Sequence, residues 1–74
     1  MPLDPQQEQA LLHQAVAALQ QGRAGEARAR LEQLTAAGSI NPVAWLLLAI
    51  ALRALGDPGA EEAVVDRLLE LDPR

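Results

Sequence analysis

The groups in this 74-residue chain that first suggest chemistry are one histidine and a run of carboxylates. A metal or nucleophile site would need partners for His13, and with no cysteine and no second histidine the chain hardly supplies them. Glu61, Glu62, Asp66 and Glu70 fall within one predicted helix, three of them at i,i+4 spacing. Like charges at that spacing repel, so this pattern predicts a solvated helix face rather than a cation site.

Two pairs of glycines raise the possibility of phosphate-binding loops. No strand pattern precedes Gly22, Gly25, Gly56 or Gly59, and the chain contains no lysine. A phosphate-binding loop is expected to follow a strand and to include a lysine, so the glycines are better interpreted as helix stops and turn residues. We therefore expect no catalytic residue, no metal, no cofactor and no enzymatic activity.

Charge and composition exclude further classes of partner. The net charge is −4 and the six cations are all arginines without a cluster, so nucleic acid is not expected. The ten apolar residues 43–52 are too few for a membrane span, which needs about 20. Without cysteine or an N-terminal signal pattern, a cytoplasmic protein is expected, and the lack of Lys, Phe and Tyr suggests a GC-rich bacterial genome.

The elements that position these residues are predicted to be helices, because Ala and Leu dominate and no stretch alternates as a strand would. Asx-Pro pairs suit the start of a helix. The Asx side chain caps free backbone N–H groups of the first turn, and the N–H that Pro lacks would have no partner within the helix at that position. Gly22, Gly38 and Gly56 are placed to end helices. These signals predict helices at about 5–21, 24–37, 42–55 and 58–71. The pairs are Asp4-Pro5, Asn41-Pro42, Asp57-Pro58 and Asp72-Pro73.

Two of these helices show an amphipathic pattern, with apolar residues at helical spacing and charged residues opposite. The loops are short, so consecutive helices should pack antiparallel as two hairpins, giving an all-α fold of four helices. The residues expected to be buried are Ala24, Ala27, Leu31 and Leu34 in the second helix, and Ala60, Val64, Leu68 and Leu71 in the fourth.

The two hairpins repeat with a period of 34 residues, because Gly22 matches Gly56, Gly25 matches Gly59 and several Ala and Leu positions match without a gap. This helix–turn–helix period is that of tetratricopeptide repeats, and the second unit resembles the family pattern in its opening Trp45, its Leu48-Ala49 pair and its closing residues 69–73. The first unit departs from the pattern, since Ser39 stands where the family has its closing proline. The resemblance implies a single domain, 1–74, that is a short α-solenoid with repeats at about 8–41 and 42–74.

In the family, the first helices of successive hairpins line a groove that contacts ligand. The resemblance places Trp45, Leu48, Ala49 and Leu52 in the core and assigns four other residues of the apolar run to the groove. The residues expected to contact a partner are Leu12, Val16, Val43, Leu46, Leu47 and Ile50, with Gln9, His13 and Arg53 at the rim. Some members hold a chaperone's C-terminal carboxylate with Lys, Asn and Arg, but here those places are aliphatic, which favours an amphipathic helix or apolar peptide.

The predicted function is a non-catalytic protein-interaction module. Its partner is another protein or, as a homodimer, a second copy of the chain. Two alternatives stay open: an N-terminal accessory or dimerisation segment of a larger enzyme, and a free-standing structural bundle whose apolar patch is covered internally.

Overall fold

A computed structural model describes residues 4–71, and all of its regular structure in that range is helical. The predicted boundaries are correct to within one residue, since the first two helices each end one residue early. The predicted all-α fold of two stacked helical hairpins is confirmed. The helices are α1 (Pro5–Gln20), α2 (Ala24–Ala36), α3 (Pro42–Leu55) and α4 (Pro58–Leu71).

The Asx-Pro pairs within the described residues begin helices as predicted. The Asp4 carboxylate accepts a hydrogen bond from the Gln7 backbone N–H at 2.8 Å, and the Gln7 side chain accepts one from the Asp4 N–H at 3.4 Å. This reciprocal pair is a capping box. Asn41 and Asp57 likewise accept from backbone N–H groups of the helices that follow them, at 3.0 and 3.2 Å. The pair Asp72-Pro73 lies outside the described residues.

Three glycines end the first three helices in the left-handed conformation. Gly22, Gly38 and Gly56 have φ values of 75, 84 and 75°, which cost an L-residue energy but not glycine. At each site the residue after the glycine donates its N–H to a carbonyl five residues earlier, at 2.7, 3.2 and 3.0 Å. This Schellman geometry satisfies carbonyls that would otherwise lack a partner and turns the chain back on itself.

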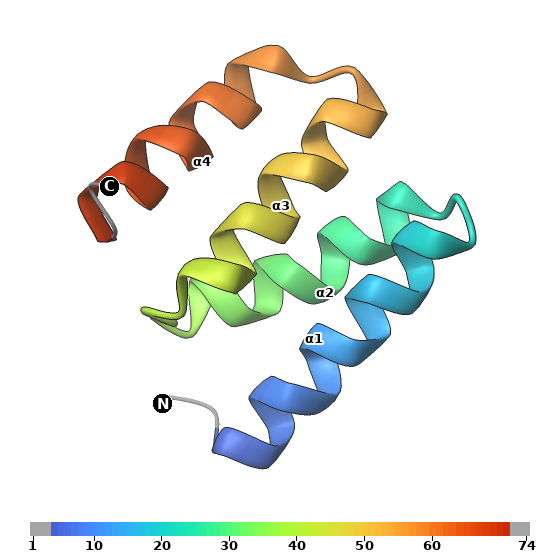
Figure 1. The fold of residues 1–74 in the computed structure, drawn as a ribbon, viewed down its shortest axis with the longest axis vertical. Coiled ribbons are helices and arrows are strands. Elements are labelled where there is room, and N and C mark those ends of the chain that lie inside the picture. Colours follow the sequence, from blue (N-terminus) through green and yellow to red (C-terminus); the bar gives the residue numbers. More distant parts are fainter. Residues whose placement is uncertain (1–3, 72–74) are drawn as a thin grey trace.

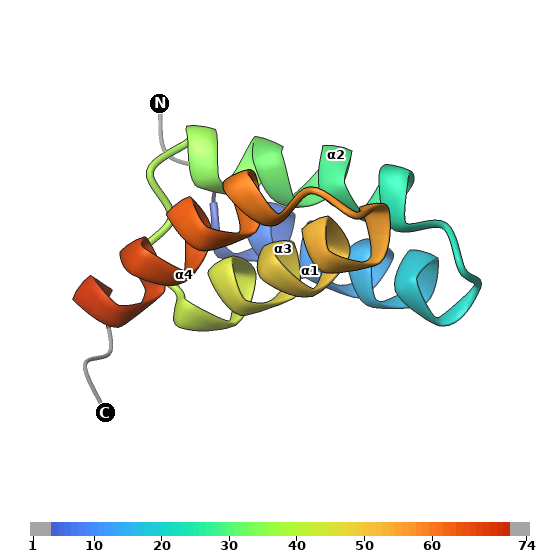
Figure 2. The same cartoon turned by 90° about the horizontal axis from the view of Figure 1, so that it is seen from above.

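The helices lie in two layers. Figure 2 shows α1 and α3 in one layer with α2 and α4 in the other, and Figure 1 shows α1 and α4 at opposite ends of the stack. Helix α2 packs against both α1 and α3, and α3 packs against both α2 and α4. Among the described helices, α4 contacts only α3, and α1 contacts α2 extensively and α3 slightly.

The core lies where the layers meet and is built mainly from leucines and alanines. Leu31 and Leu34 of α2 are the largest fully buried side chains, at 0 and 1% exposure. The buried alanines let helix backbones approach closely, and they come from three different helices. The fully buried ones are Ala15, Ala27, Ala44 and Ala51.

The predicted core positions differ in how deeply they are buried. Leu48, Ala49 and Leu52 of α3 are buried as expected, whereas Trp45 is only half-buried at the edge of the core. In α4 only Val64 is buried, at 8% exposure, while the other three predicted positions are half-buried. Helix α4 buries less because it has one neighbouring helix in the described part of the chain, where α2 has two.

Candidate interaction surface

The apolar run of α3 divides between the core and the surface. Val43, Leu46 and Ile50 are 51, 48 and 46% exposed, although Leu48 and Leu52 on the same helix are 4 and 3% exposed. The three exposed residues follow i, i+3, i+7 spacing, so they form one stripe along the helix. A single helix thus contributes both a buried face and an apolar face open to solvent.

The other three predicted contact residues lie on α1 and α3 and are less exposed than this stripe. Val16 of α1 is 37% exposed, while Leu12 and Leu47 are half-buried and pack against the core. They therefore offer less surface than the exposed stripe of α3. We call the whole set the α1/α3 apolar face: Leu12, Val16, Val43, Leu46, Leu47 and Ile50.

The predicted rim residues Gln9, His13 and Arg53 are all exposed. Gln9 and Leu12 also line a shallow hollow of about 200 Å³ between the start of α1 and the start of α3. This hollow places one predicted rim residue, Gln9, beside one predicted contact residue, Leu12. Polar groups around an apolar centre are typical of protein interfaces.

Most of the residues that first suggested chemistry lie at the surface, although Glu61 is half-buried. His13 is exposed, and so are Glu62, Asp66 and Glu70 of α4. Within residues 4–71 no three His, Asp or Glu side chains lie close enough to hold a metal ion. None of the described helices is long and apolar enough to cross a bilayer.

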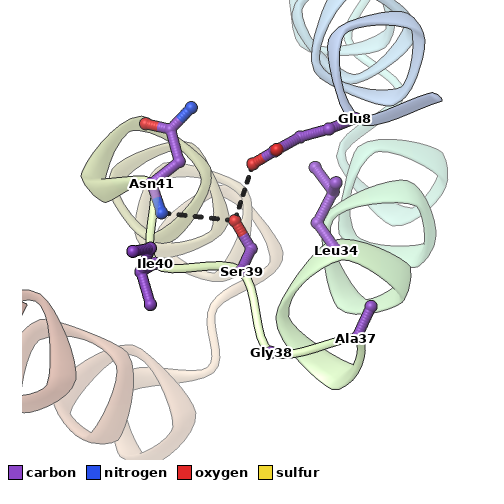
Figure 3. Close-up of a pocket in the computed structure, with 7 residues that line it drawn as sticks. All are labelled: Glu8, Leu34, Ala37, Gly38, Ser39, Ile40 and Asn41. Atoms are coloured by element: carbon purple, nitrogen blue, oxygen red, sulfur yellow. Dashed lines mark hydrogen bonds between the residues drawn. The ribbon is translucent and has the colours of Figure 1, made fainter. Parts of the chain in front are cut away.

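Sequence reasoning did not identify the hydrogen-bonded junction at Ser39, between the two hairpins. In Figure 3, the Ser39 hydroxyl donates to Glu8 of α1 at 2.8 Å and accepts from the Asn41 N–H at 3.3 Å. Ser39 also donates its backbone N–H to the Leu34 carbonyl at 3.2 Å, a bond that proline could not make. The departure from the family pattern thus has a structural role: Ser39 connects the α2–α3 loop to α1 and α2.

Trp45 extends this junction towards α4. Its indole N–H donates to the Ser39 carbonyl at 2.9 Å, which satisfies the polar edge of a half-buried ring. The Arg67 guanidinium lies 5.8 Å from the ring centroid, within cation–π range, and also donates to Glu70 at 2.8 Å. Trp45 therefore links its own helix both to the preceding loop and to α4.

Stacked antiparallel helical hairpins, whose first helices end at glycines 34 residues apart, define a helical-repeat protein of the α-solenoid class. The Tetratricopeptide repeat family model matches residues 5–74, so the chain belongs to this family. The searches of curated proteins and of solved structures gave no match. Tetratricopeptide repeats are protein–protein interaction modules and are generally not catalytic, so family membership indicates a protein-binding role.

Proposed function

We propose that this chain binds an amphipathic helix or apolar peptide of a partner protein on the α1/α3 apolar face. The observation that carries the proposal is the stripe of Val43, Leu46 and Ile50, each about half exposed on a helix that buries another of its faces in the core. Scattered single aliphatic residues are normal on a protein surface, whereas a contiguous patch is typical of interaction sites.

Burial of this patch would contribute favourably to binding. Covering about 300 Å² of apolar surface gains roughly 7 kcal/mol at about 25 cal/mol per Å², before the cost of association. An amphipathic helix has apolar side chains at i, i+3 and i+7, the same spacing as the stripe on α3. Two such helices can pack with their apolar stripes together, while Gln9, His13 and Arg53 stay in contact with water.

We also propose two alternatives to a partner helix as the group that covers this face. A second copy could cover it in a two-fold homodimer, because an aliphatic stripe is complementary to itself. In a larger enzyme, the same face could dock the domain beside a catalytic unit. Both versions depend on the same side chains and differ only in what covers them.

The test uses a synthetic helical peptide with leucines at i, i+3 and i+7 on an alanine–glutamine background. Binding should shift the methyl NMR signals of Val43, Leu46 and Ile50. Leu46→Glu should abolish these shifts, because a carboxylate at the centre of the contact must lose its hydration.

The matched control is Leu69→Glu. Leu69 is 51% exposed and Leu46 is 48% exposed, but Leu69 lies on α4, away from this face. Both variants should remain folded, as judged by far-UV circular dichroism. The proposal would be refuted by equal loss of binding in the two variants, or by peptide shifts confined to α4.

A further inference from the structure

The packing of α3 on α2 indicates what kind of helix could cover the outer side of α4, because α2 and α4 are equivalent helices of the two repeats. Leu31 of α2 is 0% exposed, but Val65, its equivalent 34 residues later in α4, is 37% exposed. Thr35 is half-buried, but its equivalent Leu69 is 51% exposed. These differences arise because α3 packs on α2, whereas α3 is the only described helix that packs on α4. Helix α4 thus keeps an uncovered face, which we call the α4 end face and define as Glu62, Val65 and Leu69.

The opposite end of the stack shows the complementary pattern. Ala10 and Ala17 of α1 are exposed, but Ala44 and Ala51, their equivalents in α3, are completely buried. Helix α3 has the preceding hairpin on that side, and no described helix lies there on α1. We call this surface the α1 end face: Ala10, Gln14, Ala17 and Arg23. Its alanines are the same residue type that lets α3 approach α2 closely.

Charges at the two end faces are also complementary. At the internal junction, Arg28 of α2 lies 4.0 Å from Asp57, which follows α3. The residue 34 positions after Arg28 is Glu62, and the residue 34 positions before Asp57 is Arg23. The charge at each of the two equivalent positions is therefore reversed. Packing of α1 on α4 in the manner of α3 on α2 would again bring opposite charges together.

We propose that the α4 end face binds the α1 end face of a second copy, so that the solenoid continues from one molecule to the next. This is a head-to-tail contact that does not close, and it leaves the α1/α3 apolar face free. The reverse arrangement, α4 against α4 about a two-fold axis, is disfavoured because it would bring Glu62 and Asp66 against their own copies.

One difference between the two repeats should make this contact weaker than the packing of α3 on α2. Gln14 is exposed in α1, where α3 has the buried Leu48. In the proposed contact the Gln14 amide would lose part of its hydration, which opposes association. We therefore expect reversible assembly that depends on protein concentration, and Gln14→Leu should strengthen it.

Sedimentation velocity of the purified chain across a dilution series tests the proposal. Glu62→Arg and Arg23→Glu should each weaken association about fivefold, and the double variant should recover most of the loss, because the charge pair is restored in reverse. A double variant as weak as either single variant would overturn the proposal, as would a wild-type chain that stays monomeric at every concentration.

Two further comparisons separate this contact from the α1/α3 apolar face. Val65→Glu should abolish assembly, whereas Ala63→Glu should not, because Ala63 is an exposed α4 residue on the opposite side of the helix. Leu46→Glu should leave assembly intact. Assembly that is lost in Leu46→Glu but kept in Val65→Glu would show self-association through the α1/α3 apolar face and would refute the head-to-tail contact.

Discussion

Replacing Leu31 with alanine tests how the core of this small domain is distributed. Leu31 is 0% exposed, and α2, on which it lies, packs against both α1 and α3. Truncating a fully buried leucine costs about 2–5 kcal/mol, because apolar contacts are lost and a cavity remains. A domain of 74 residues has a free energy of unfolding of about 4–11 kcal/mol, so this one change should remove a large part of it.

Leu69→Ala is the matched control, since it is the same substitution in a helix of the other hairpin. Leu69 is 51% exposed, so less apolar area is lost and no closed cavity forms. The higher helix propensity of alanine offsets part of the loss, and we expect a cost below about 1 kcal/mol. The contrast between the two leucines follows from the single-sided packing of α4.

The assay is urea unfolding in dilute solution, followed by far-UV circular dichroism. For a protein of this size the denaturant slope is about 1 kcal/mol per M, so Leu31→Ala should lower the midpoint by roughly 3 M and Leu69→Ala by less than about 1 M. Equal shifts for the two variants, or a loss below about 1 kcal/mol for Leu31→Ala, would refute the assignment of Leu31 to the core between the hairpins.

Two further predictions concern the turns. Gly56→Ala should destabilise the domain by about 1 kcal/mol, because φ is 75° at that position. Gly25→Ala should stabilise it by about 0.5 kcal/mol, because Gly25 lies in α2 and a Cβ added there would meet no atom within 4 Å. Thermal unfolding of both variants measures the difference, and equal effects would contradict the prediction. Ser39→Pro should lower the free energy of unfolding more than Ser39→Ala does, although proline is the family's residue at this position. Both variants lose the hydroxyl that bonds to Glu8, but proline also removes the backbone N–H that bonds to the Leu34 carbonyl. A Ser39→Pro variant at least as stable as the wild type in urea would disprove this role.

Local signals in the sequence were sufficient for the helices and their ends. Asp4, Asn41 and Asp57 cap helices through their own side chains, and the three helix-ending glycines adopt the left-handed conformation that favours glycine. These interactions join residues within a few positions of one another, so the chemistry of the nearby residues specifies them. The 34-residue period and the family resemblance were also visible in the sequence, because they depend on residue types at fixed positions.

Periodicity also indicated which apolar residues share a helix face, but not what covers each face. Leu46, Leu47 and Ile50 were all assigned to the groove, yet Leu47 packs against the core while the other two are about half exposed. Trp45 was expected in the core, but lies at its edge between the Ser39 carbonyl and Arg67. Exposure depends on the position of neighbouring helices, which a helical pattern alone does not specify.

The sequence by itself therefore determined the helices, their antiparallel pairing, the repeat and the family, because short-range capping, turn geometry and helical spacing specify them. Only the tertiary structure decided that Leu12 and Leu47 pack against the core and that Ser39 joins α1 to the loop before α3. It also decided that α2 is covered on both sides and α4 on one, within the described residues. The physical reason is that burial and long-range hydrogen bonds arise between segments distant in the chain, once the helices have packed.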